Sequence, residues 1–74
     1  MATLKDLREE SSLTLAELAT TIGVSIQTVW RWENAKARPS PSHRRKLAEM
    51  YRKETKEIVE AVKNTFDSHW AVAA

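Results

Sequence analysis

Apolar residues recur along this chain at the three- and four-residue spacing of helices, and no segment of useful length alternates with the two-residue period of a strand. Helix-breaking residues are few, since the chain has one glycine, Gly23, and two prolines, Pro39 and Pro41. The pattern therefore predicts an all-α fold, a compact bundle of four to five helices. The expected helices cover residues 3–10, 14–22, 25–34, 41–52 and 55–70.

The first two helices have recognisable starts. Thr3 is followed three residues later by Asp6, and Thr14 is followed in the same way by Glu17. In such a capping box the hydroxyl accepts a hydrogen bond from a free N–H of the first turn, and the carboxylate accepts one from the N-cap residue. We therefore expect helices to begin directly after Thr3 and Thr14.

The single glycine lies between two stretches of helical pattern. Glycine adopts the left-handed backbone conformation without a Cβ clash, so Gly23 can end the second helix abruptly. Ser25 can then act as the N-cap of the third helix. Two helices joined by so short a turn cross steeply, and the sequence therefore predicts a helix-turn-helix with Gly23 as its turn residue.

The second half of the chain contains one break and one ambiguous segment. Ser40 can cap the fourth helix, with Pro41 at its first position, where the missing N–H costs nothing. Residues 52–57 are polar, and they form either a short linker or the middle of one long helix. We favour a break between Lys53 and Thr55.

The last predicted helix carries apolar residues at every fourth position, with Val59 beside them: Ile58, Val62, Phe66 and Trp70. One interpretation is that this stripe closes the core of the monomer, which suits Ile58 and Val62. The other is that it forms a dimer interface, which suits Phe66 and Trp70. Residues 55–74 are therefore a candidate dimerisation element within a single domain expected to cover residues 1–74.

The third helix has two different faces on a helical wheel of about 100° per residue. Val29 and Trp32 point to one side, and Trp32 is expected in the core. Gln27 and Arg31 point to the opposite side, and these residue types can pair with the edges of adenine and guanine. Trp30 lies on the flank, where it either covers the stem of a neighbouring polar side chain or contacts a deoxyribose or thymine methyl group.

Charge is distributed unevenly along the chain, although the net charge is only +2. Residues 31–53 contain eight Lys and Arg against two Glu, a net charge of +6, whereas residues 1–30 and 54–74 each carry −2. A basic middle segment indicates either a surface that meets a polyanion or a solvated basic helix. Charge by itself does not separate these readings.

Several classes of function are not expected. The chain has no cysteine, and its two histidines, His43 and His69, lie far apart without a nucleophile or a set of ligands at metal-binding spacing. We therefore expect no enzyme, no cofactor, no metal ion and no small-molecule substrate. Because no apolar run reaches the length of a signal peptide or a membrane span, we expect a cytoplasmic, nucleoid-associated protein without a membrane partner.

Residues 4–51 resemble the Cro/cI-type (XRE) helix-turn-helix family, the lambda-repressor-like DNA-binding domains. The stretches "LREESSLTLAELATTIGVS" and "RWENAKARPSP" carry the resemblance. The residues at the family's characteristic positions are Leu18, Ala19, Ile22, Gly23, Val24, Val29 and Trp32. The resemblance implies a sequence-specific transcriptional regulator, a repressor that binds double-stranded DNA as a homodimer on a palindromic operator with the third helix in the major groove.

The resemblance also implies roles for individual residues. The positions that contact bases are Ile26, Gln27, Thr28 and Arg31, with Trp30 beside them. The positions that contact phosphates are Thr14, Ser25 and Asn34, together with Lys36 and Arg38 in the loop that follows the DNA backbone or the adjacent minor groove. Arg8 and Glu33 are expected to form an ion pair that braces the third helix against the first.

Three positions depart from the family pattern. Leu15 stands where a glutamine commonly contacts a phosphate, so that contact is either lost or passes to backbone N–H groups. Ala35 replaces a glycine, so we expect Asn34 to make the left-handed turn after the third helix. Arg44 replaces a leucine, and it either lies along the bundle surface or joins a phosphate-facing cluster with His43, Arg45 and Lys46.

These departures leave a second class of function open. Leu15, Trp30 and Arg44 each weaken the expected DNA-binding surface. A protein-interaction module on the same fold, such as an antitoxin or an adaptor that binds a protein partner, is therefore the alternative hypothesis.

Overall fold

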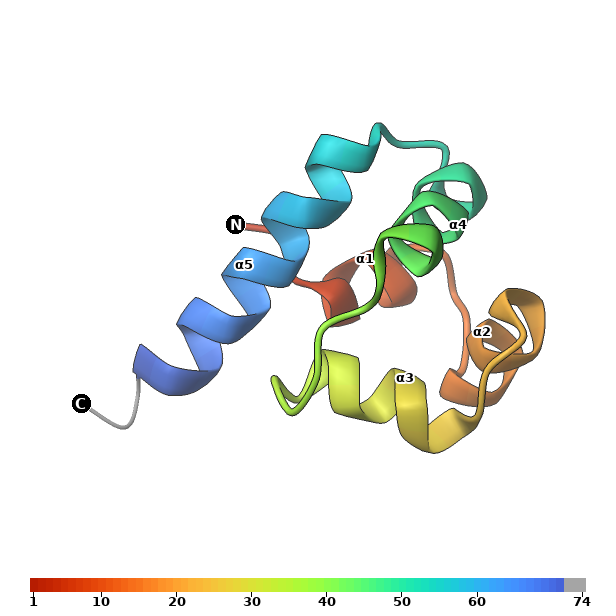
Figure 1. Ribbon diagram of the computed structural model, residues 1–74, viewed down its shortest axis with the longest axis horizontal. Helices are drawn as coiled ribbons and strands as arrows, with labels where there is room; N and C mark the ends of the chain where they lie inside the picture. Colours follow the sequence, from red (N-terminus) through yellow and green to blue (C-terminus); the bar gives the residue numbers. More distant parts are fainter. Residues whose placement is uncertain (72–74) are drawn as a thin grey trace.

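The computed structural model describes residues 1–71, and within that range the regular structure is entirely helical (Figure 1). The helices are α1 (Leu4–Glu10), α2 (Leu15–Ile22), α3 (Ile26–Glu33), α4 (Pro41–Tyr51) and α5 (Thr55–Ala71). The predicted all-α fold is confirmed, and each helix boundary lies within one residue of its expected place. The chain breaks between α4 and α5 near the favoured position, whereas the last three residues of the 55–74 segment lie outside the described residues.

The helices surround one core, with α5 along one side of the bundle and the α2–α3 pair at the other end (Figure 1). α1 packs against both α3 and α5, while α4 packs against α2 and α5. The N-terminus lies beside α5, so the start of the chain packs next to the last described helix (Figure 1). This arrangement leaves one long side of α3 free of other helices.

Side chains cap the N-termini as the sequence predicts. The Thr3 hydroxyl accepts a hydrogen bond from the Asp6 N–H (3.2 Å), and the Asp6 carboxylate accepts one from the Thr3 N–H (3.0 Å). Thr14 and Glu17 form the same reciprocal pair at 3.1 and 2.9 Å. The hydrogen bond from the backbone of each threonine lowers the pKa of the paired carboxyl, so both carboxylates stay charged to a lower pH than free carboxyl groups do.

The C-termini of the first four helices share one geometry. A residue in the left-handed region ends each helical run, and the N–H of the next residue bonds to a carbonyl five positions earlier, as in a Schellman motif. These bonds are Leu13 to Arg8 (3.2 Å), Val24 to Ala19 (3.0 Å), Lys36 to Arg31 (2.8 Å) and Lys53 to Ala48 (2.9 Å). Repetition of this motif explains how short helices reverse direction so sharply.

Only one of the four left-handed residues is a glycine. Gly23 has φ 86°, as expected for the turn between α2 and α3. The other three, Ser12, Ala35 and Arg52, all have φ 56°. The prediction that Asn34 makes the turn after α3 is wrong, because Asn34 has φ −106° and Ala35 takes the left-handed conformation itself. Its methyl group is buried, so packing offsets part of the backbone cost.

The core takes residues from every helix: Leu4, Leu7, Leu18, Ala19, Ile22, Val29, Trp32, Leu47, Ala48, Ile58, Ala61 and Val62. Two polar residues of α5 are buried beside it. Thr65 Oγ1 accepts a hydrogen bond from the Leu4 N–H (3.0 Å) and donates one to the Ala61 carbonyl (2.8 Å). Asn64 Nδ2 donates to the Ala2 carbonyl (2.9 Å). Through these bonds α5 satisfies backbone groups at the start of the chain.

The four-residue stripe of α5 does not stay on one face. Ile58 and Val62 are buried, Phe66 is half-buried, and Trp70 is 52% exposed. A four-residue step turns about 40° further than a full helical turn, so three such steps rotate the stripe by about 120°. The stripe therefore begins in the core and ends on the flank of the molecule, where Val59 is also 47% exposed.

Candidate nucleic-acid interface

The exposed face of α3 is held in place by its own buried face. Ser25 caps the helix by accepting a hydrogen bond from the Thr28 N–H (3.1 Å), and Val29 and Trp32 are both buried against the other helices. Gln27 and Arg31 are both exposed, as the helical wheel predicts. α3 therefore presents a firmly held polar edge to solvent.

Two parallel rows of side chains occupy this exposed face. Gln27 and Arg31 form a polar row, because residues four apart are neighbours on a helix surface. Ile26 and Trp30 form an apolar row beside it, and they are 52% and 45% exposed. Within residues 1–71 no cation lies over the Trp30 ring. An amide, a guanidinium and two apolar groups thus face solvent together.

The hydroxyl and amide groups at the ends of α2 and α3 already have partners. Ser25 Oγ and Thr28 Oγ1 lie within hydrogen-bond distance at 2.8 Å, and Thr28 is half-buried. Asn34 Nδ2 donates to the Trp30 carbonyl at 2.9 Å, and Thr14 is occupied by its capping box. These groups lie near the edges of the exposed face, and each would have to bind a phosphate in addition to the hydrogen-bond partner that it already has.

An ion pair joins α1 to the end of α3. Arg8 Nε donates to Glu33 Oε2 at 2.7 Å, and Arg8 Nη2 donates to Glu33 Oε1 at 3.0 Å. The same guanidinium donates to the Leu13 carbonyl at 2.9 Å. The hydrogen bonds with Glu33 raise the pKa of Arg8, and little of either side chain is exposed. The predicted Arg8–Glu33 pair is therefore present and bidentate, a geometry that fixes orientation as well as distance.

The loop between α3 and α4 alternates between inward and outward side chains. Ala35 and Pro39 are buried and Ala37 is half-buried, whereas Lys36 and Arg38 are exposed. The two cations were expected from the sequence, whereas the buried small residues between them were not. The alternation of alanine and proline with basic residues in "AKARP" is the signal that would have shown this arrangement.

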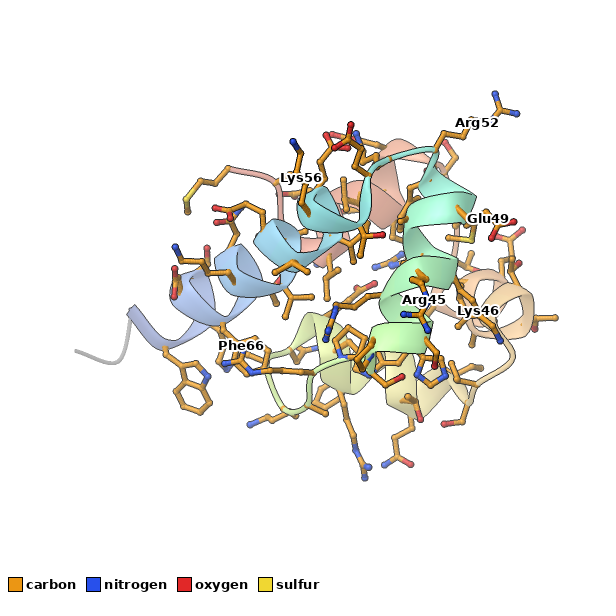
Figure 2. The ribbon with its side chains drawn as sticks, turned by 45° about the horizontal axis from the view of Figure 1, so that its top comes forward. Arg45, Lys46, Glu49, Arg52, Lys56 and Phe66 are labelled. Atoms are coloured by element: carbon orange, nitrogen blue, oxygen red, sulfur yellow. The ribbon has the colours of Figure 1, made fainter. Side chains whose placement is uncertain are left out.

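Both loop cations lie against aromatic rings of α5. The guanidinium carbon of Arg38 lies over the Phe66 ring, 4.0 Å from its centre, and Lys36 Nζ lies 5.9 Å from the centre of the Trp70 ring. Figure 2 shows Phe66 pointing from α5 toward this loop. The two residues predicted as a dimer interface therefore have partners within their own chain, although much of Trp70 stays exposed.

The basic residues of α4 do not form one cluster. Arg44 Nη1 donates to the Pro39 carbonyl at 2.9 Å, and Lys46 Nζ approaches the Ile22 carbonyl at 3.5 Å, so each contacts a different neighbouring segment. Arg45 stays exposed (Figure 2). His43 lies on its Ser40 cap, with Nδ1 3.0 Å from the hydroxyl. Of the predicted group, Arg45 is the side chain without a hydrogen bond or ion pair within residues 1–71.

The departure at Leu15 leaves the first residue of α2 without a polar group for a phosphate, and the Leu15 side chain is half-buried against the core. Tyr51, near the end of α4, has a buried hydroxyl without a hydrogen-bond partner in the described residues. Burial, followed by the charge of Glu33, raises the pKa of Tyr51 to about 12. Tyr51 is therefore neutral at physiological pH.

No group of three or more His, Asp or Glu side chains is arranged to hold a metal ion within residues 1–71. No helix of the described residues is both long and apolar enough to cross a membrane.

The comparison with known protein families gave one result. The sequence profile of a family described as "Helix-turn-helix domain" matches residues 2–60, which covers α1 to α4 and the first part of α5. Neither the curated proteins nor the solved structures contain a significant match to the chain.

Proposed function

The chain belongs to the helix-turn-helix domain family, and we propose that it is a transcriptional regulator that reads double-stranded DNA with α3 in the major groove. The observation that carries the proposal is the exposed row of Gln27 and Arg31 on a helix fixed by a capped start and a buried rear face. Glutamine pairs with adenine and arginine with guanine, each worth about 1–3 kcal/mol of discrimination. Ile26, Thr28 and Trp30 would complete the base-contacting set.

Phosphate contacts would supply affinity without sequence preference. The exposed cations Lys36, Arg38 and Arg45 lie on the segments that follow α3, and they are the side chains best placed for this role. Thr14, Ser25 and Asn34 would contribute neutral phosphate contacts at the helix ends. We assign smaller shares to Arg44 and Lys46, because their nitrogens already contact carbonyl groups.

Repression is the regulatory effect that this proposal favours, because a domain seated in the major groove of a promoter excludes other proteins from it. A protein acting in this way would reside with the nucleoid in the cytoplasm.

Random-site selection on double-stranded DNA, followed by sequencing, tests the proposal. We expect a short consensus whose preference relaxes at one or two positions for Gln27→Ala, because that amide would read a base edge. Lys5→Ala, an exposed cation on α1, is the matched control and should return the wild-type consensus. The absence of any consensus at moderate salt would refute sequence-specific recognition.

We extend the proposal to a homodimer on a palindromic operator. Val59 and Trp70 support it, because both are about half exposed on the same flank of α5. Sedimentation of the wild-type chain should give the dimer mass, and Val59→Lys should give the monomer mass. A wild-type monomer both free and on DNA would exclude the dimer. Truncation after Asn64 is a poor test, because it removes the Thr65 acceptor of the Leu4 N–H.

Ile26 and Trp30 favour the second candidate, a module that binds another protein. Two neighbouring apolar side chains, each about half exposed, are unusual on a face that only meets phosphates and base edges. Salt dependence separates the two functions, since neutralising several phosphates makes DNA affinity fall steeply with salt concentration. Weak binding to DNA with a shallow salt dependence would favour the protein-binding module.

A further inference from the structure

We propose that Phe66 and Trp70 are positioning residues for DNA binding, because their rings hold Arg38 and Lys36 where these cations meet the DNA backbone. The inference rests on the proposed DNA-binding function and adds a part of the chain to it. Both rings lie beyond residue 60, where the family match ends. The end of α5 would thus belong to the DNA interface.

The backbone of the loop is already fixed on its inner side. The Lys36 N–H bonds to the Arg31 carbonyl at 2.8 Å, and the Pro39 carbonyl accepts a hydrogen bond from Arg44 at 2.9 Å. Ala35, between the end of α3 and Lys36, is buried. The long side chains of Lys36 and Arg38 remain free, and each loses rotamer entropy when it binds a phosphate.

The aromatic contacts reduce that freedom without using the donor groups. The guanidinium carbon of Arg38 lies 4.0 Å from the centre of the Phe66 ring, a distance that suits stacking of the flat guanidinium group on the ring. The N–H donors of a guanidinium lie in its plane and stay available at the edge for a phosphate. Within residues 1–71 neither Arg38 nor Lys36 has a side-chain hydrogen bond or an ion pair, so both charged groups remain available to a phosphate.

The turn of α5 that precedes Phe66 is anchored to the rest of the fold. Val62 is buried, and Thr65, directly before Phe66, bonds to the Leu4 N–H. Figure 1 shows α5 running past the loop that joins α3 to α4, and Figure 2 shows Phe66 on the side of α5 that faces it. Because the apolar stripe rotates out of the core along α5, it delivers its last two rings to the loop.

A merely structural role for Phe66 is the competing account, since its ring also packs against the core. Phe66→Leu keeps an apolar side chain but removes the aromatic face, whereas Phe66→Tyr keeps that face. DNA affinity is measured by fluorescence anisotropy at several salt concentrations on a selected site and on a scrambled duplex. Ser68→Ala, an exposed position on the same helix, is the control. Circular dichroism and sedimentation check the fold and assembly of each variant.

We expect Phe66→Leu to weaken binding about three- to tenfold on both duplexes, as for a partly exposed cation–π contact. The slope of log affinity against log salt should become shallower by up to about one, the share of a single phosphate contact. Phe66→Tyr and Ser68→Ala should match the wild type. Arg38→Ala should reproduce the loss, and the double variant Phe66→Leu/Arg38→Ala should lose no more than Arg38→Ala alone.

Trp70 provides a second test at an exposed position where substitution does not endanger the fold. Trp70→Leu should weaken both duplexes alike and add nothing to Lys36→Ala, while Trp70→Phe should bind as the wild type does. Losses that multiply in the double variants, or equal effects of the aromatic and leucine variants, would overturn the inference. Salt-dependent binding that is unaffected by these changes would overturn it and leave the proposed function standing. Absence of DNA binding by the wild type would overturn both.

Discussion

Four residues that differ in type share the same left-handed backbone conformation. Ser12, Gly23, Ala35 and Arg52 each end a helix in the left-handed region, although only glycine adopts it without a steric cost. Gly23 was predictable because a lone glycine between two helical patterns has few other uses. The other three were not, because their conformation is imposed by the following N–H, which bonds to a carbonyl five residues back.

Arg52 offers a stability prediction at this scale, since it is exposed and its φ is 56°. Arg52→Gly relieves the clash of the Cβ atom, offset in part by the added entropy of the unfolded chain, and should stabilise the fold by about 0.5–1 kcal/mol. Thermal unfolding should show a midpoint roughly 4 °C higher. Arg52→Ala removes the same charge but keeps the Cβ atom, and a gain of equal size in this control would contradict the explanation.

Tyr51 gives a prediction for alkaline pH. Burial raises its pKa to about 12, whereas a tyrosine of the unfolded chain has a pKa of about 10. Between these values the unfolded state loses the proton and the folded state keeps it, so stability falls as pH rises from about 10 to 12. Below that window Tyr51 adds no pH dependence.

The measurement compares unfolding midpoints of the wild type and Tyr51→Phe across this range. The unfolding midpoint of the wild type should fall more steeply with pH than that of the variant. Subtracting the two curves cancels the effect of the lysines, which titrate in both proteins. At neutral pH Tyr51→Phe should cost little, because the hydroxyl lacks a partner in the described residues. Parallel curves above pH 10 would show that the buried hydroxyl does not titrate as proposed.

At the scale of the elements, the sequence predicted where helices begin better than how the last helix is used. Capping boxes and the Ser-Pro start of α4 are local hydrogen-bond patterns, so they were visible without tertiary structure. The roles of Asn64 and Thr65 were not, because a buried polar residue becomes intelligible only with its partner near the N-terminus. The exposure of Trp70 at the end of α5 follows from the four-residue spacing of its apolar residues, because each step rotates the stripe further from the core.

Thr65 is the element-scale test of how α5 supports α1. Thr65→Val keeps the shape of the side chain but leaves the Leu4 N–H without its acceptor, which should cost about 1–3 kcal/mol of unfolding free energy. Thr65→Ser restores the hydroxyl and should recover most of that loss. Urea unfolding measures both variants. A valine variant as stable as the wild type would mean that the bond between these helices contributes nothing.

The whole molecule is organised so that one face of α3 stays free. The Arg8–Glu33 pair ties the end of α3 to α1, and the buried Val29 and Trp32 hold its rear face. The family resemblance predicted this pair and the general placement of α3, and the periodicity of the sequence predicted the exposed row. Neither could predict which cations of the basic middle segment are occupied by carbonyl groups, because that depends on side-chain geometry across helices.

The measurement that bears most directly on the role of α3 is the affinity of Arg31→Ala for a selected DNA site and for a scrambled duplex of equal length, with Lys36→Ala beside it. Loss of a base contact should weaken Arg31→Ala roughly 5- to 150-fold on the selected site only, the equivalent of about 1–3 kcal/mol. Loss of a phosphate contact should weaken Lys36→Ala equally on both duplexes. An Arg31→Ala variant that loses the same factor on both duplexes, or that loses nothing, would contradict recognition of bases by α3.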